Sequence, residues 1–272
     1  MRLPKLALFL ILTAIAFSGA FFTYEYSMQR TPESQLSQKQ SWSTVFQADF
    51  ESGSFRPYFN DVLVTSCGAN DTITKTLAHT GQYSEHDHYN GGPCTENIRS
   101  YPTEAFPIAM STFYVELWVY VPAVNLTDWV SFATLHLTDD TFITIDSNRV
   151  RELHVYNGAL QDITTQVNPI KWPFDAWFKI GIFGELNPGF NSTIILYQDD
   201  VPVVDFNGYT GHGILGRMHL GLYLGKNQGA FNVYNDDIKV LTPYGSSQTP
   251  PLETIMIISV SDLREAVGGR DG

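Results

Sequence analysis

Alternating hydrophobic and other residues dominate the middle of the chain. In residues 112–121 every second position is apolar, a period of two that is typical of a half-buried strand. Similar short runs, separated by Gly, Pro, Asn and Asp, are residues 44–50, 72–78, 130–137, 142–146, 150–156, 177–183, 192–197, 201–206, 218–224 and 230–241. About eleven strands with no convincing amphipathic helix predict an all-β sandwich of two antiparallel sheets.

The run at 112–121 also predicts which side chains are buried. The side chains expected to face the core between the sheets are Phe113, Val115, Leu117, Val119 and Val121. Glu116 and Trp118 should then face the other way, because successive strand side chains point to opposite faces.

The two ends of the chain differ from this core. Residues 1–22 carry Arg2 and Lys5 and then an uncharged apolar run, the order of an export signal, with a small-residue cleavage site after Ala20. The run would reach about 25 Å as a helix, so an uncleaved membrane anchor is the alternative. Residues 23–43 form a polar spacer, 44–243 the β-sandwich domain, and 244–272 a linker and a short C-terminal tail. We therefore expect a secreted or cell-surface protein that meets the membrane only through its N-terminal segment.

Charge and cysteine content narrow the possible partners. The chain has 28 acidic and 16 basic residues and a formal net charge of −12, which argues against nucleic acid. In an oxidising compartment Cys67 and Cys94 are expected to form a disulfide, with their Cα atoms about 4.4–6.8 Å apart. Two buried free thiols are the alternative. Asn70, Asn125 and Asn191 begin sequons, which predict a glycoprotein.

Several segments resemble a known superfamily in their order along the chain. These are residues 49–53 (DFESG), 114–122 (YVELWVYVP), 177–180 (WFKI), 194–203 (IILYQDDVPV) and 233–240 (VYNDDIKV). They resemble the concanavalin A-like lectin/glucanase superfamily, especially its polysaccharide-lyase-like and laminin G-like jelly rolls. In the hairpin at 194–203 the turn is Asp199-Asp200, which tolerates a positive φ less well than the Asp-Gly turn of the family. The resemblance covers roughly residues 46–243 and implies a jelly-roll sandwich.

The lyase branch of this superfamily has two strand motifs with counterparts here. The first, Gln-x-His, corresponds to residues 134–136 (TLH), which keep the histidine. The second, Tyr-x-Lys-x-Gly-x-Tyr, corresponds to residues 217–223 (RMHLGLY), which keep the glycine and the last tyrosine. Residues 95–99 (TENIR) are a loose counterpart of the family's arginine strand. The resemblance implies catalytic roles for His136, Tyr223 and Arg99 in β-elimination on a uronate glycan.

Strand periodicity gives these positions a second interpretation. Residues two or four apart share one face of a strand, so Thr134 lies on the face of His136, and Arg217 and His219 lie on the face of Tyr223. If the strands are neighbours, they form a concave, polar groove for polysaccharide, with Trp118 or Trp129 at its rim. Glycan binding is the leading prediction, a polysaccharide lyase is the alternative, and a non-catalytic structural cell-surface domain is the third. A hydrolase is less favoured because the chain lacks a Glu-x-Asp-x-x-Glu strand.

Two groups of residues have metal-ligand chemistry. Jelly rolls of this type often bind a structural calcium between their first and last strands, and Glu51 with Asp236 or Asp237 are the matching oxygen donors. The sequence His86-Asp87-His88 could supply two metal ligands, but no third is identifiable from spacing. We expect it to be a solvated loop. No other cofactor is predicted.

Overall fold

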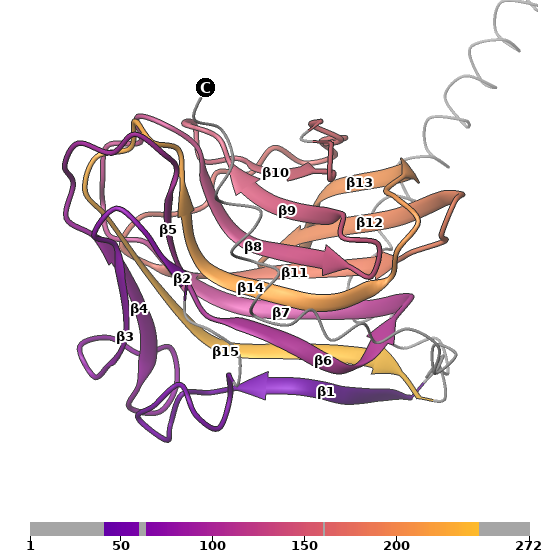
Figure 1. The fold of residues 1–272 in the computed structure, drawn as a ribbon, viewed down its shortest axis with the longest axis horizontal. Coiled ribbons are helices and arrows are strands. Elements are labelled where there is room, and N and C mark those ends of the chain that lie inside the picture. Colours follow the sequence, from indigo (N-terminus) through magenta and orange to yellow (C-terminus); the bar gives the residue numbers. More distant parts are fainter. Residues whose placement is uncertain (1–40, 60–63, 160, 245–272) are drawn as a thin grey trace, which may run out of the picture.

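The computed structural model describes residues 41–59, 64–159 and 161–244, which form two layers of antiparallel strands (Figure 1). These ranges contain no helix, so none of their segments provides a helix that could cross a membrane. The all-β sandwich prediction is confirmed. The predicted signal or anchor segment at 1–22, nearly all of the spacer, and the C-terminal tail after Tyr244 lie outside the described residues.

Sheet A contains eight strands in the order β13-β12-β11-β7-β15-β4-β3, with β1 also paired to β15. Their bounds are β1 Trp42–Ala48, β3 Asn70–Thr74, β4 Ser84–Tyr89, β7 Thr112–Tyr120, β11 Trp177–Glu185, β12 Asn191–Gln198, β13 Val201–Tyr209 and β15 Phe231–Pro243. The long strand β15 pairs with β4 along its first half and with β1 along its second half.

Sheet B contains seven strands in the order β10-β9-β8-β14-β5-β2, with β6 also paired to β14. Their bounds are β2 Val64–Thr65, β5 Ile98–Tyr101, β6 Thr103–Met110, β8 Val130–Leu137, β9 Phe142–Ser147, β10 Leu153–Tyr156 and β14 Leu215–Leu224. Figure 1 shows β8, β9 and β14 of this sheet lying over β7 and β11 of sheet A.

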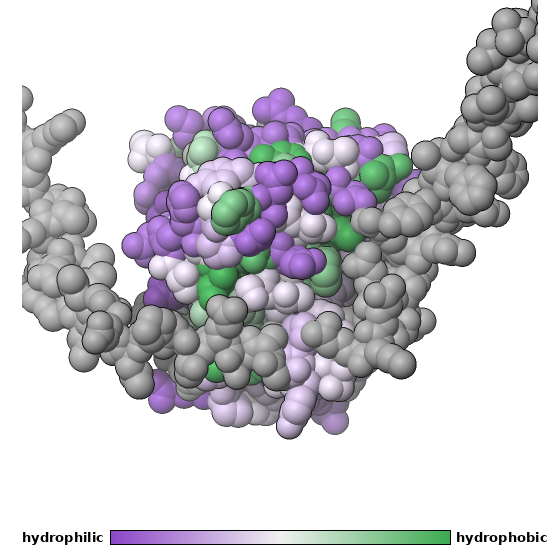
Figure 2. All heavy atoms as spheres, turned by 90° about the vertical axis from the view of Figure 1, so that its right-hand side faces the viewer, coloured by the Kyte–Doolittle hydropathy of each residue, from purple (hydrophilic) through white to green (hydrophobic). Residues whose placement is uncertain are grey.

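The core lies between the two sheets and matches the alternation of residues 112–121. All five of the apolar side chains predicted to face it are 0% exposed, whereas Glu116 and Trp118 are half-buried on the outer face. The register prediction is therefore confirmed. At the end of the sandwich drawn in Figure 2, hydrophilic residues mix with scattered hydrophobic ones.

The hairpin between β12 and β13 turns at Asp199-Asp200, and both residues adopt a positive φ. Asp199 and Asp200 have φ values of 51° and 66°. The Asp199 carboxylate accepts a hydrogen bond from the Lys179 backbone N–H at 2.8 Å, and Asp200 pairs with the Lys179 ammonium at 2.6 Å. These contacts hold two aspartates where glycine is more usual.

Four strands were not predicted: β2, β4, β5 and β6. The most informative is β4, which includes His86-Asp87-His88, so the prediction of a solvated loop is wrong. Glu85 and Asp87 are each 0% exposed on the core side of this strand. The strand looks like a loop in sequence because its buried positions are acidic rather than apolar.

The two cysteines form the predicted disulfide, with a Cα–Cα distance of 5.9 Å between Cys67 and Cys94. The bond joins the segment after β2 to the segment before β5. The asparagines of all three sequons, Asn70, Asn125 and Asn191, are exposed. Glycosylation stays a prediction, and these side chains are accessible to it.

Candidate functional site

Three neighbouring strands of sheet B bring most of the predicted site residues to one face. In the pairing of β14 with β8, Arg217 lies opposite His136 and His219 lies opposite Thr134. In its pairing with β5, Tyr223 lies opposite Arg99. The apolar side chains that alternate with them, such as Leu135 and Leu222, are buried in the core. The site residues therefore lie on the outer face of the sheet.

Ring contacts connect these residues into one row. The His136 Nε2 and His219 Nδ1 atoms are 3.1 Å apart, so one ring donates a hydrogen bond to the other. Tyr101 on β5 stacks on His219 with ring centroids 4.7 Å apart, and its ring meets the Tyr223 ring edge-on at 6.4 Å. We call His136, His219, Tyr101, Tyr223 and Arg99 the sheet B site.

Tyr223 has the most partners in this site. The Arg99 guanidinium lies 5.3 Å from the centre of its ring, and the Asn97 amide donates a hydrogen bond to its hydroxyl at 3.3 Å. Trp129 packs edge-on against the same ring at 5.0 Å. A phenol, a guanidinium and a carboxamide thus meet on a half-buried surface. This arrangement suits a planar anion beside an apolar ring.

Burial sets the protonation of the two histidines. It lowers the pKa of His136, and the nearby Arg217 charge lowers it further. For His219, burial together with His136 and Arg217 lowers the pKa to about 3. Both imidazoles are therefore neutral near pH 7, and the positive charge of the surface comes from Arg99 and Arg217.

A half-buried aspartate, Asp146 on β9, lies next to the site. Asp146 is opposite Ser131 of β8, which in turn is opposite Tyr223 of β14. Burial raises the pKa of Asp146 to about 6, although the neighbouring polar side chains of Ser131 and Thr144 counteract this rise. Its Oδ1 has no hydrogen-bond partner.

Replacing Asp146 with asparagine should change how stability depends on pH. The folded state holds a proton on Asp146 between about pH 4 and 6, where the unfolded chain has lost it, so this group's stabilising contribution disappears as pH rises through that window. The unfolding free energy of Asp146→Asn minus that of wild type should be about 2 kcal/mol larger at pH 7.5 than at pH 3.5. Urea unfolding at both pH values measures this gain. The prediction would be contradicted if the stability difference between variant and wild type were the same at pH 3.5 and pH 7.5.

Sequence reasoning missed Tyr101, Asn97 and Asp146. Asn97 lies two residues before Arg99 and Tyr101 two residues after it. Because residues two apart share one face of a strand, the alternation around Arg99 could have predicted Tyr101. Asn97 precedes β5 and Asp146 comes from a different strand. Their proximity to the site follows from strand order, which the sequence does not give.

Trp118 does not join the sheet B site, and its predicted place there is wrong. It lies on β7 in sheet A and faces the opposite surface of the sandwich. There its ring stacks on His79 at 3.8 Å, and Trp177 meets His79 edge-on at 5.5 Å. Trp129, the other predicted rim residue, does lie beside Tyr223.

The residues predicted to hold calcium already have hydrogen-bond partners from one loop. The Glu51 carboxylate accepts from the backbone N–H groups of Gln82 and Tyr83, at 2.8 and 2.9 Å. Asp236 accepts from the backbone of His79 at 2.8 Å, and Asp237 contacts the His79 ring at 2.7 Å.

Among the described residues, no compact ligand set combines Glu51 with the two aspartates. These carboxylates face N–H donors rather than carbonyl oxygens, so the arrangement does not fit a calcium ion.

The histidines of β4 have other roles. His86 stacks on Tyr234 at 4.2 Å and bonds to Asn232 at 3.0 Å, and neither it nor His88 belongs to a metal-ligand cluster within the described ranges.

Comparisons with known proteins identify the fold. No protein-family model matches the sequence, and no curated protein matches it. An endo-β-1,4-glucuronan lyase from the fungus Trichoderma reesei matches in structure with a TM-score of 0.59 and 12% identity, over 75% of this chain and 98% of that one. The cellulose induced protein Cip1 matches with a TM-score of 0.57 and 15% identity, over 72% and 96%. A carbohydrate esterase from the Shiga toxin-encoding bacteriophage phi24B gives 0.50 and 12%, over 75% and 100%. Together with the two-sheet topology, these matches show that the chain has the concanavalin A-like jelly-roll fold.

Proposed function

We propose that this protein binds an acidic polysaccharide, one that contains uronate sugars, on the sheet B site. The observation that carries the proposal is the environment of Tyr223, where Arg99 and Asn97 converge on one aromatic ring. An aromatic face packs against the C–H surface of a sugar, and a guanidinium with a carboxamide binds a carboxylate.

Charge supports an anionic sugar. The whole chain has a net charge of −12, yet Arg99 and the exposed Arg217 lie on the same face of sheet B. The nearby histidines are neutral near pH 7, so these arginines supply the local positive charge. A uronate glycan would be attracted to this face and repelled by much of the remaining surface.

The fold and the disulfide agree with an extracellular role. One structural neighbour is an endo-β-1,4-glucuronan lyase, and glucuronan is a uronate polymer. The bond between Cys67 and Cys94 is typical of proteins that leave the reducing cytosol. We infer that the chain is exported through its N-terminal segment and meets its glycan outside the cell.

β-Elimination is the second candidate, and the placing of His136 and Tyr223 on one face favours it. The reaction removes the proton next to the uronate carboxylate and breaks the glycosidic bond, whose oxygen takes up a proton. Arg99 and Asn97 would hold the carboxylate, and the Tyr223 hydroxyl and the neutral His136 imidazole are the groups able to exchange protons. The Tyr101 ring contacts both Tyr223 and His219, and His219 in turn contacts His136.

Removing the Tyr223 ring tests the binding proposal. Tyr223→Ala should weaken affinity for a uronate oligosaccharide by about 1–3 kcal/mol, because it removes the ring that meets the sugar. The matched control is Trp118→Ala, which deletes a half-buried aromatic from the opposite face. Calorimetric titration of both variants measures the effect. Equal affinities of wild type and Tyr223→Ala, or a loss seen only in Trp118→Ala, would contradict the proposal.

A further inference from the structure

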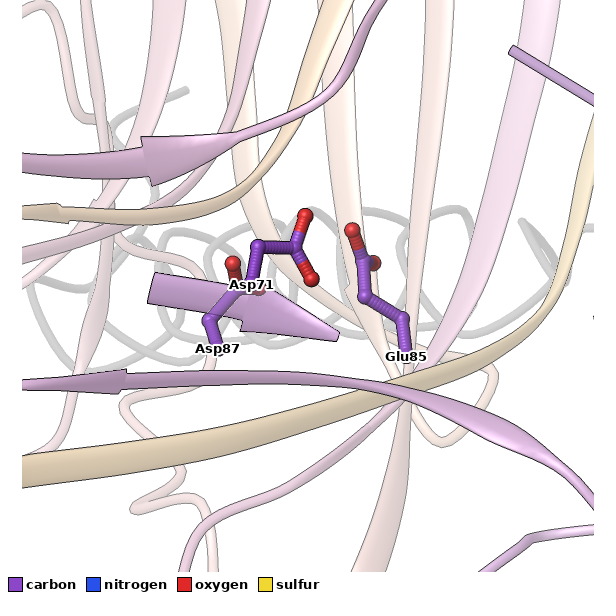
Figure 3. Close-up of side chains that lie close together, drawn as sticks. All are labelled: Asp71, Glu85 and Asp87. Atoms are coloured by element: carbon purple, nitrogen blue, oxygen red, sulfur yellow. The ribbon is translucent and has the colours of Figure 1, made fainter. Parts of the chain in front are cut away.

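Three carboxyl groups are enclosed between the sheets, away from the sheet B site. Asp71 on β3 is 4% exposed, and Glu85 and Asp87 on β4 are each 0% exposed. One oxygen from each lies within 4.8 Å of the others. Figure 3 shows the Asp71 and Glu85 carboxyl groups directed toward the same space, with Asp87 beside them. We call these residues the acidic trio.

Within the described part of the chain, no ion pair neutralises the trio. Five of its six oxygens have no hydrogen-bond partner, namely both of Asp71, both of Glu85 and the Oδ1 of Asp87. An uncompensated buried carboxylate is very costly, and three in one place repel one another. The trio therefore requires either protons or a cation.

Two neutral side chains with oxygen atoms, from other strands, lie in the same buried region as the trio. Asn235 on β15 and Ser100 on β5 are each 0% exposed. The Asn235 amide nitrogen donates to Asp87 at 3.3 Å, while its Oδ1 has no partner. The Ser100 hydroxyl also has no hydrogen-bond partner, and both Asp87 and the Ser100 backbone lie against Gly221 of β14. Unpaired buried amide and hydroxyl oxygens are a second reason to expect a ligand, independent of the acids.

A glycine allows a strand of sheet B to approach this group closely. Gly221 of β14 has a φ of 114°, and a Cβ atom on it would lie 2.6 Å from an Asp87 oxygen and 2.9 Å from the Ser100 carbonyl oxygen. Any side chain at this position would displace Asp87. Glycine at this position therefore lets β14 pass close to Asp87.

We propose that the acidic trio, with Asn235 and Ser100, binds one hard divalent cation of the Ca²⁺ class. Calcium takes six to eight oxygen ligands at about 2.3–2.6 Å, so ligands on opposite sides of the ion are about 5 Å apart. One oxygen of each trio residue lies within 4.8 Å of the others, so a single ion could contact all three. The ion neutralises two of the three carboxylates, the third is balanced if it keeps its proton, and the two neutral oxygens extend the shell. This site uses other carboxylates than Glu51, Asp236 and Asp237, although its Asn235 directly precedes Asp236 on β15.

The cation would connect the two sheets. The trio and Asn235 come from sheet A, whereas Ser100 comes from sheet B. Ser100 lies between Arg99 and Tyr101, whose side chains point the other way into the sheet B site. Binding of the ion would therefore stabilise the sandwich directly behind that site.

The experiment uses the full chain, freed of metal by a chelator and then titrated with CaCl₂. We expect one bound calcium per chain by elemental analysis and a rise of about 5–10 °C in melting temperature at calcium concentrations about 100-fold above the dissociation constant. Glu85→Gln should lose both the bound ion and the temperature shift. Glu51→Gln, which alters an exposed carboxylate in the other region, should keep both.

Two outcomes would overturn the proposal. If wild type binds no calcium and its melting temperature is unchanged by calcium and by chelator, the trio holds protons instead. If Glu51→Gln loses the ion and Glu85→Gln retains it, the ion belongs to the other region. Because the wild-type titration needs no variant, the proposal remains testable even if Glu85→Gln fails to fold. Glycan affinity does not enter any of these readouts.

Discussion

Trp172→Ala should lower the free energy of unfolding by about 3–5 kcal/mol, the usual cost of deleting a large buried aromatic side chain. Trp172 is 0% exposed, stacks on Phe178 with centroids 5.6 Å apart, and meets Phe132 edge-on at 5.7 Å. Its indole N–H also donates to the Ser147 hydroxyl at 2.7 Å. The substitution would leave a cavity between the sheets and remove the hydrogen bond to the Ser147 hydroxyl, which would keep only its own bond to the Asn148 carbonyl oxygen at 3.0 Å.

The control for this prediction is Phe190→Ala. Phe190 is 69% exposed, so its removal should change stability by less than about 0.5 kcal/mol. Urea unfolding followed by circular dichroism gives both values. A loss below about 1 kcal/mol for Trp172→Ala would show that the segment before β11 is not part of the core.

His136→Ala should reduce the elimination of a polyuronate by about 10²–10⁴-fold while binding is retained, if the second candidate function is correct. The imidazole is half-buried, neutral near pH 7 and held by His219 at 3.1 Å, which suits a group that exchanges protons. The matched control is His86→Ala, which removes a half-buried histidine from the opposite sheet. Ultraviolet absorbance of the unsaturated product measures turnover.

The result of this assay separates the candidate functions. Turnover by wild type that is lost only in His136→Ala supports a lyase. Binding without turnover by wild type supports a lectin-like module and contradicts the elimination candidate. If wild type shows neither binding nor turnover, the third alternative, a structural cell-surface domain, becomes the best account.

The parts of the fold that could be predicted are those in which local pattern and burial agree. Residues 112–121 alternate cleanly because one face packs in the core and the other is half-buried. Strand β4 could not be predicted in this way, because Glu85 and Asp87 occupy the buried positions that apolar residues usually fill. An acidic core strand cannot be distinguished from a polar loop by hydrophobic periodicity alone.

For the site, the sequence could predict which residues share one face of a strand, but not which strands lie next to each other in the sheet. Spacing placed Arg217, His219 and Tyr223 on one side of a strand, and the structure puts that strand between those of His136 and Arg99. Trp118 and Trp129 could not be distinguished in the same way. Their positions depend on which sheet each strand joins, and sheet order is decided by tertiary packing.

The measurement that tests the central claim most directly is a titration of the isotope-labelled protein with a uronate oligosaccharide, followed by NMR of its side chains. The account predicts that the rings of Tyr101, Tyr223 and His219 shift together, and that a neutral glucan of equal length leaves them unchanged. Shifts confined to Trp118, Trp177 and Tyr234 on the opposite sheet, or no shift at millimolar oligosaccharide, would contradict it.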